Sequence, residues 1–240
     1  MIDRALLIDS AAALGVTVDA VAAERLDEYA IRLTEWNQRM NLTAITDPEG
    51  IVLKHFVDSL AAAPLLPEGP FSLIDVGTGA GFPGVPLAIL RGDMTLTLLD
   101  SLNKRLMFLE DLCRAVGVSA TRIHARAEEG GQNPDLRERF DVATARAVAG
   151  MPELTELCLP FVKVGGRFLA LKGPDGEREQ TEAAAAVRVL GGRFGEGRQV
   201  TIPNPAPEGG VSRRNILVVE KVAATPKKSP RPNVKKAAPL

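Results

Sequence analysis

The chain has 240 residues, of which 45% are apolar and 25% are charged, and its formal net charge is −1. This composition is that of a soluble globular protein with a substantial core, and no apolar run approaches the roughly 20 residues of a membrane span. Its two cysteines and two histidines provide neither a disulfide framework nor the ligand spacing of a metal site. Because Asp3 and Asp9 interrupt the segment where a secretory signal would lie, we expect a cytoplasmic protein. A chain of this length can bury a core without a partner, so we expect a monomer.

The first 65 residues are predicted to form a small helical domain. Apolar residues at spacings of three and four lie on one face of a helix. They are Leu26, Tyr29, Leu33, Trp36 and Met40. Another helix is predicted to begin at Pro48, with the Asp47 side chain as its cap, and to continue to about residue 63.

From residue 66 to residue 222 strand and helix patterns alternate, which predicts an α/β domain with a mostly parallel sheet covered by helices on both sides. The seven predicted strands are 71–76, 94–100, 120–125, 140–145, 166–172, about 198–202 and 214–221. The predicted helices are 84–91, 103–116, 151–162 and 177–190. A proline-rich loop, and no helix, joins the last two strands, so we expect them to form an antiparallel hairpin at the edge of the sheet.

A glycine-rich turn follows the first predicted strand and indicates a pocket for a nucleotide-type cofactor. Gly77, Gly79 and Gly81 lack a Cβ, so the backbone can bend sharply there and a ligand can approach it closely. The helix that follows points free amide groups at such a ligand. Asp100, which ends the second predicted strand, is placed to accept hydrogen bonds from two ribose hydroxyls.

Two cofactors fit this turn. Read from Gly79, the sequence matches the dinucleotide fingerprint G-x-G-x-x-G, which favours an NAD-dependent oxidoreductase. The predicted strand ends at Val76, however, so the turn begins at Gly77 and Asp75 lies two residues ahead of it. An acid before G-x-G-x-G is typical of enzymes that use S-adenosylmethionine (SAM). The SAM interpretation is therefore preferred, and a glycine-rich loop without a ligand is the third alternative.

The ends of the later strands supply further candidate residues, because ligands of open α/β sheets bind at the carboxyl ends of the strands. Residues 125–129 could offer a backbone amide and a carboxylate to an adenine ring, or could simply open an exposed helix. Arg146 and Lys172 follow the fourth and fifth strands and could contact a phosphate or remain solvated. Of the two histidines, His55 is the better candidate for a substrate contact.

Several segments together resemble one family. They are Trp36-Asn37, Asn41-Leu-Thr-Ala-Ile45, Lys54-His55-Phe56, Asp58-Ser-Leu60, Asp75 through Gly84, Leu99-Asp100-Ser101, Lys104-Arg105, Ala127-Glu128, Ala145-Arg146-Ala147 and Leu171-Lys172-Gly173. Over about residues 20–220 the chain is similar to the bacterial 16S ribosomal RNA guanine-N7 methyltransferases, also called glucose-inhibited division protein B. The Asn-Leu-Thr-Ala-Ile and Gly-Phe-Pro-Gly segments make this resemblance specific.

The resemblance implies a class I SAM-dependent methyltransferase fold and methylation of N7 of one guanine in 16S ribosomal RNA, free or in the small ribosomal subunit. Carried over by residue, the cofactor contacts are Gly77, Phe82, Ala127, Glu128 and Arg146. We expect RNA contacts from Asn41, Lys54, His55, Arg146 and Lys172. Guanine N7 has an exposed lone pair, so no catalytic acid or base is required. A non-catalytic RNA-binding module with the same fold is the remaining alternative.

Residues 223–240 differ in composition from the rest of the chain. They contain four prolines and five basic residues and no acid. The basic residues are Lys227, Lys228, Arg231, Lys235 and Lys236. We expect this tail to be disordered. It is either a solvated terminus or a basic arm that adds salt-sensitive affinity for RNA.

Overall fold

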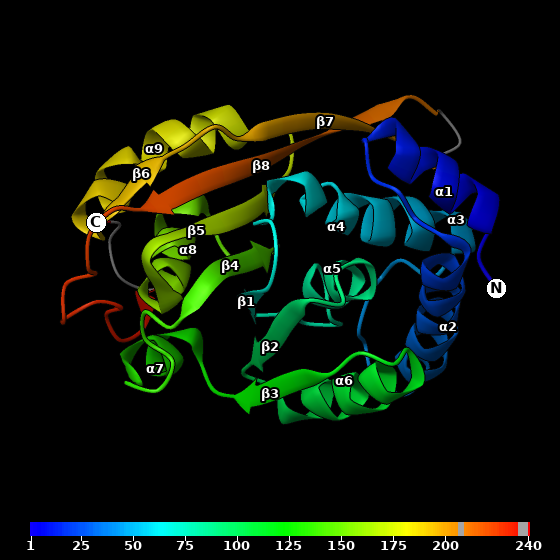
Figure 1. Ribbon diagram of the computed structural model, residues 1–240, viewed down its shortest axis with the longest axis horizontal. Helices are drawn as coiled ribbons and strands as arrows, with labels where there is room; N and C mark the ends of the chain where they lie inside the picture. Colours follow the sequence, from blue (N-terminus) through cyan, green and yellow to red (C-terminus); the bar gives the residue numbers. More distant parts are fainter. Residues whose placement is uncertain (206–208, 235–239) are drawn as a thin grey trace.

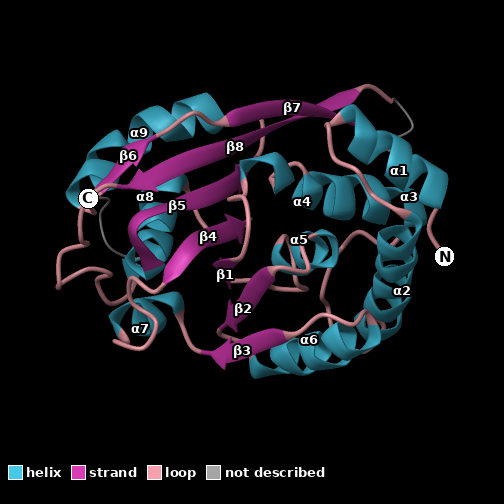
Figure 2. Ribbon diagram, viewed as in Figure 1, coloured by secondary structure: helices cyan, strands magenta, loops and turns pink. Residues whose placement is uncertain are grey.

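The structure is a computed structural model that describes residues 1–205, 209–234 and 240. The described residues form one eight-stranded sheet in the order β3-β2-β1-β4-β5-β8-β6, with β7 also paired to β8 (Figures 1 and 2). The strands are β1 Phe71–Val76, β2 Met94–Asp100, β3 Ala120–His124, β4 Phe140–Arg146, β5 Val162–Lys172, β6 Gly192–Phe194, β7 Arg198–Pro203 and β8 Val211–Lys221. The first five strands are parallel and β8 is antiparallel to β5. Strand order reverses between β1 and β4, which is where ligands of open α/β sheets bind.

Helices cover both faces of the sheet, as the alternating pattern predicts. They are α5 Gly84–Leu90, α6 Asn103–Ala115, α7 Ala127–Gln132, α8 Met151–Cys158 and α9 Gly176–Val189. Successive strand residues point to opposite faces, so Leu73 packs in the cluster that contains α5 and α6, whereas Ile74 packs in the cluster that contains α8 and α9. In Figure 1, α8 and α9 lie toward the left of the view, and α5 and α6 lie to their right, beyond β4 and β1.

The N-terminal helices share a core with the sheet. They are α1 Arg4–Ala13, α2 Ala20–Asn37 and one continuous helical segment made of α3 Pro48–Gly50, the π-helical η1 Ile51–Val57 and α4 Asp58–Leu60. The Asp47 side chain accepts a hydrogen bond from the Gly50 amide at 2.5 Å and caps this segment as expected. Leu26, Tyr29 and Leu33 are buried in the same cluster as Leu73. The hydrophobic core is therefore continuous across residue 65.

The last two predicted strands form an antiparallel hairpin at the edge of the sheet, as expected. β8 pairs with β7 antiparallel and also lies against β5, so it is an internal strand. The short β6, which the sequence did not predict, pairs with the other end of β8. Phe194 pairs with Val219, and the next pair along the strands is Arg198 with Ile216. Between these two pairs the β6–β7 segment has one residue more than β8. β6 and β7 therefore act as one edge strand interrupted by a bulge.

The expectation of a disordered tail is wrong for residues 223–234. Thr225, Ser229 and Val234 are buried, and the Arg231 guanidinium lies 2.8 Å from the carboxylate of Glu156 in α8. Composition favoured disorder because the tail has few apolar residues, but hydrogen bonds to distant residues hold it. Lys235 and Lys236 lie outside the described residues.

Two further observations concern the described part of the chain. Cys113 and Cys158 are free, buried thiols, as expected of core cysteines, and burial raises the pKa of Cys113 to about 11. Among the described residues, no helix has the length and apolar character needed to cross a bilayer.

Candidate active site

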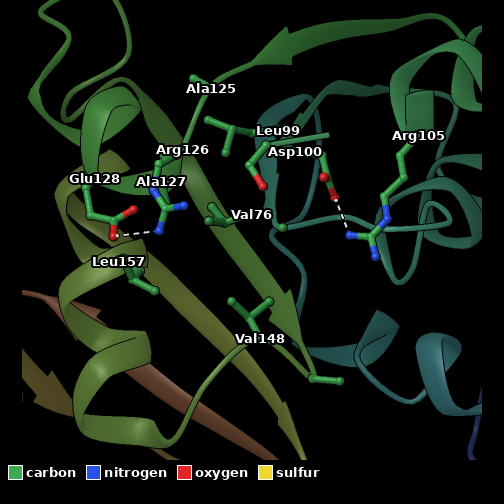
Figure 3. Close-up of a pocket in the computed structure, with 13 residues that line it drawn as sticks. Val76, Leu99, Asp100, Arg105, Ala125, Arg126, Ala127, Glu128, Val148 and Leu157 are labelled. Atoms are coloured by element: carbon green, nitrogen blue, oxygen red, sulfur yellow. Dashed lines mark hydrogen bonds and ion pairs between the residues drawn. The ribbon is translucent and has the colours of Figure 1, made fainter. Parts of the chain in front are cut away.

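A cavity of about 250 Å³ lies at the carboxyl ends of β1, β2, β3 and β4 (Figure 3). We call it the first cavity. Its lining residues are Val76, Gly77, Leu99, Asp100, Ser101, Arg105, Ala125, Arg126, Ala127, Glu128, Ala147, Val148 and Leu157. Apolar side chains thus face a rim of two carboxylates and two guanidinium groups. This arrangement suits a ligand that has both a flat apolar ring and polar groups.

The glycine-rich loop that borders the first cavity is held by Asp75. This carboxylate is fully buried and accepts hydrogen bonds from Thr78 Oγ1 at 2.7 Å, the Gly84 amide at 3.0 Å and Thr144 Oγ1 at 3.1 Å. Burial raises the pKa of Asp75 to about 6, although the three donors oppose that rise. Asp75 thus shapes the loop from beneath and does not line the cavity.

The loop glycines are required where the backbone is left-handed and crowded. Gly77 has a φ of +68°, and a Cβ on it would lie 2.9 Å from Val148 Cγ2. Gly81 has a φ of +97°, and a Cβ there would lie 2.6 Å from the Tyr29 hydroxyl. That hydroxyl donates a hydrogen bond to the Ala80 carbonyl at 2.5 Å. Helix α2 therefore supports the loop on the side away from Val148.

Asp100 lies in the first cavity as predicted, but its carboxylate already has protein partners. It accepts hydrogen bonds from the Gly79 amide at 2.9 Å and the Leu102 amide at 2.9 Å, and Arg105 Nη1 lies 3.3 Å away. A carboxylate has about four acceptor positions. The predicted contact of Asp100 with two ribose hydroxyls would therefore compete with these donors. Ser101, which the sequence analysis did not select, is exposed in the same cavity.

The start of α7 forms the wall opposite the glycine loop. Ala127 and Glu128 line the cavity there, with the Glu128 carboxylate 3.4 Å from Arg126 Nη2 (Figure 3). Glu128 is 9% exposed, and a carboxylate in the first turn of a helix is stabilised by the helix dipole. The predicted cofactor residues Gly77, Asp100, Ala127 and Glu128 are thus brought together around one cavity.

The other predicted cofactor residues are placed elsewhere. Gly79 and Gly81 belong to the same loop but do not line the first cavity. Phe82 is buried between two rings, with centroids 5.0 Å from Tyr29 and 4.5 Å from His55. Arg146 covers the Phe82 ring, with its guanidinium carbon 4.8 Å from the ring centroid.

Arg146 lines a second cavity, of about 450 Å³, between η1 and the ends of β4, β5 and β8. This second cavity is lined by Ile45, Lys54, His55, Asp58, Arg146, Ala147, Leu171, Lys172, Gly173, Glu179 and Arg214. Ala147 lines both cavities and has a φ of +56°. A left-handed alanine is strained, and such strain is found at functional sites. Ala147 is therefore a wall residue that the two cavities share.

A hydrogen-bonded network fixes Arg146 against the N-terminal helices. Arg146 Nη1 donates to Asp58 Oδ2 at 2.8 Å and to the Lys54 carbonyl at 3.0 Å, and Nη2 lies 3.2 Å from His55 Nδ1. Asp58 also accepts from Arg214 Nε at 2.7 Å. The Asp58 carboxylate thus joins α4 to β4 and β8 through two arginines.

His55 is held in one tautomer by these contacts. A guanidinium has no acceptor, so His55 Nδ1 accepts from Arg146 and the proton lies on Nε2, which donates to Thr43 Oγ1 at 2.8 Å. Burial, together with the Arg146 charge, lowers the pKa of His55 to about 3. Both ring nitrogens are therefore occupied by protein partners, Arg146 and Thr43.

The remaining predicted RNA residues differ in how accessible they are. Lys172 Nζ donates to the Ala149 carbonyl at 2.9 Å and lies 2.6 Å from Glu179, so its charge is compensated. The ammonium of Lys54 has no hydrogen bond or ion pair with the residues the structure describes, and it faces the second cavity. Asn41 is exposed and does not line either cavity.

Known proteins similar to this chain identify its family. A sequence model described as rRNA small subunit methyltransferase G matches residues 22–196. The chain belongs to this family. The ribosomal RNA small subunit methyltransferase G of Clostridium beijerinckii is 47% identical over 231 residues, which are 94% of this chain and 93% of that protein. Its counterpart from Acetivibrio thermocellus is 44% identical over 229 residues, 95% of this chain and 92% of that protein.

Solved structures show the same fold at low identity. A precorrin-6y C5,15-methyltransferase from Geobacter metallireducens superposes with a TM-score of 0.54 at 19% identity and covers 76% of this chain and 91% of its own. TYW2 of M. jannaschii in complex with AdoMet superposes with a TM-score of 0.52 at 13% identity, covering 67% and 73%. The predicted class I methyltransferase fold, the family resemblance and the SAM cofactor are confirmed. The dinucleotide interpretation of the loop is not supported, and β1 ends at Val76, as the SAM interpretation requires.

The buried, neutral His55 predicts a specific loss of stability in acid. Between pH 6.5 and 3 the unfolded chain binds a proton at this residue and the folded chain does not, so the free energy of unfolding falls as the pH falls below 6.5. From pH 7 to pH 5 this residue alone should remove about 2 kcal/mol. Urea denaturation at each pH should show a shallower pH dependence for His55→Gln than for the wild type.

The matched control is His124→Gln, at the exposed histidine of the chain. It is expected to keep the pH dependence of the wild type. Equal dependences for the wild type and His55→Gln would show that His55 protonates in the folded state in its ordinary range.

Proposed function

We propose that this enzyme methylates N7 of a guanine in 16S ribosomal RNA of the small ribosomal subunit, at a conserved loop near the decoding centre. The observation that carries the proposal is that the two cavities share the wall residue Ala147, because a methyl group must pass directly from a donor to a neighbouring acceptor. The family's curated members, which are named for small-subunit ribosomal RNA, support the choice of acceptor.

The residues of the first cavity fit SAM. Val76, Leu99 and Leu157 provide apolar surface for an adenine ring, and the Glu128 carboxylate lies at the edge of that surface. Gly77 and Val148 line the same cavity, and we assign the methionine part of the molecule to them. Ser101 and Asp100 lie between these two regions, where the ribose would be held.

The second cavity fits a nucleotide of RNA. It contains four cationic side chains and two carboxylates, Asp58 and Glu179, and its neutral His55 adds no charge, so its net charge is +2. An excess of positive charge favours the phosphodiester backbone. RNA-binding proteins commonly hold unstacked loop bases in such pockets. We assign the accessible Lys54 to the phosphate, with Arg146 and Lys172 shaping the wall.

The chemistry requires placement of the acceptor atom and no proton transfer. SAM supplies a methyl group on a positively charged sulfur, and the N7 lone pair forms the new N–C bond as the C–S bond breaks. Since N7 bears no proton, no residue of the two cavities is required to act as a base. The Arg146 network would hold the acceptor, and Asp75 fixes the loop that would hold SAM, so the protein's contribution would be to position the two reactants.

The assignment of SAM to the first cavity predicts the behaviour of Gly77→Ala. A Cβ at a φ of +68° costs about 1–2 kcal/mol of stability and would clash with Val148 where SAM is placed. SAM affinity measured by calorimetry should fall about tenfold, equivalent to ~1.4 kcal/mol. Gly69→Ala is the matched control, since Gly69 has a φ of +69° and open space around it. Similar affinities for the two variants would contradict the assignment.

The assignment of RNA to the second cavity predicts a selective effect of Lys54→Ala. The variant should raise the KM for RNA and reduce the slope of log affinity against log salt by about 0.7, the value for one phosphate contact on single-stranded RNA. SAM affinity should not change, because Lys54 does not line the first cavity. The KM for RNA and its salt dependence are measured with deproteinised RNA and with isolated small subunits as methyl acceptors.

Lys227→Ala serves as the control, because this exposed lysine lies in the tail and does not line the second cavity. It should keep the wild-type salt slope. A Lys54→Ala variant with unchanged RNA affinity and an unchanged slope would exclude the second cavity as the phosphate site.

A further inference from the structure

The tail residues 225–234 contact α7 and α8, the two helices that also supply part of the first cavity. Ala127 and Glu128 of α7 and Leu157 of α8 line that cavity. Other residues of the same helices hold the tail, which lies beside α7 and α8 in Figure 1. The family model ends at residue 196, so this segment lies outside it.

The end of α7 is fastened to the tail by three sets of contacts. The Gln132 side chain donates to the Pro230 carbonyl at 3.0 Å. Pro230 also packs directly on Gly131, where an added Cβ would lie 2.9 Å from Pro230 Cγ. Arg137 Nη1 then joins the two segments, donating to the Gly131 carbonyl at 2.8 Å and to the Ser229 carbonyl at 2.7 Å.

In α8 the tail compensates a buried charge. Glu156 is 1% exposed and precedes the cavity residue Leu157. Its carboxylate accepts from the Arg231 backbone amide at 2.8 Å, from Arg231 Nε at 2.9 Å and from Arg231 Nη2 at 2.8 Å. A buried carboxylate that lost these donors would be left uncompensated. Val234, 1% exposed, packs in the same hydrophobic cluster as Leu157.

Helices as short as these depend on such contacts. α7 has six residues and α8 has eight. In water, helices of this length are unstable alone, so tertiary contacts set their position. The tail supplies contacts to both helices at once and thereby links the positions of Glu128 and Leu157.

We propose that residues 225–234 position the wall of the cofactor cavity, with Arg231 as the main positioning residue, so that the tail contributes to SAM binding and not to RNA binding. The proposal rests on the assignment of the first cavity to SAM. It also accounts for one of the five basic residues of the tail, because Arg231 is paired with Glu156 and is not available to a phosphate.

The test compares Arg231→Ala with Lys228→Ala in the full chain. Lys228 is exposed, and its ammonium has no partner within the described ranges, so its loss removes an equal charge without a contact. For Arg231→Ala the Kd and the KM for SAM should rise about 3- to 10-fold, with the KM for RNA unchanged. Arg231→Lys, which keeps a positive charge beside the Glu156 carboxylate, should show a smaller rise. Lys228→Ala should behave as the wild type.

Hydrogen exchange gives a second measurement that does not depend on activity. The amides of residues 127–130 should exchange faster in folded Arg231→Ala than in Lys228→Ala. If Arg231→Ala does not fold, the same comparison is made with Arg231→Lys.

Three results would overturn the proposal. They are wild-type SAM affinity in a folded Arg231 variant, a rise in the KM for RNA alone, and an equal loss of SAM affinity in Lys228→Ala. Gly77→Ala in the same titrations separates the two assignments. If Gly77→Ala and the Arg231 variants all bind SAM normally, the first cavity is not the SAM site. If the Arg231 variants bind SAM normally and Gly77→Ala does not, only the positioning role of the tail is wrong.

Discussion

The buried carboxylate of Asp75 is the interaction on which the site depends. It does not line the first cavity. It accepts hydrogen bonds from Thr78 in the loop, from Gly84, the first residue of α5, and from Thr144 in β4. These three partners lie on the two sides of the point where strand order reverses. A side chain without acceptors at this position would leave buried donors unpaired, each at a cost of about 1–3 kcal/mol. The loop conformation and the β1–β4 junction are therefore stabilised together.

The N-terminal helices complete this arrangement from the other side. Tyr29 donates to the loop at Ala80, and the Phe82 ring is stacked between Tyr29 and His55 under the Arg146 guanidinium. Aromatic and cation–π contacts of this kind favour a fixed geometry. The same arginine that covers the loop lines the second cavity. The glycine-rich loop and the second cavity are thus parts of one packed unit.

Features set by neighbouring residues could be predicted from the sequence, and features set by distant partners could not. The apolar run before Gly77 predicted the end of β1, and Asp47 predicted the start of a helix, because both signals are local. The burial of His55 depends on Arg146, 91 residues away, and the order of the tail depends on the pairing of Arg231 with Glu156, 75 residues away. Composition alone cannot show such pairs. The three-residue β6 is too short to have a recognisable period.

We propose that two cavities that share the wall residue Ala147 hold SAM and a guanine of 16S ribosomal RNA, and that the methyl group passes from one to N7 of the other. The most direct test is to map N7-methylguanine by mass spectrometry in 16S ribosomal RNA from cells with and without the gene for this chain. The account predicts that one N7-methylguanine disappears without the gene and returns with the wild-type chain. An identical set of N7-methylguanines in both strains would contradict it.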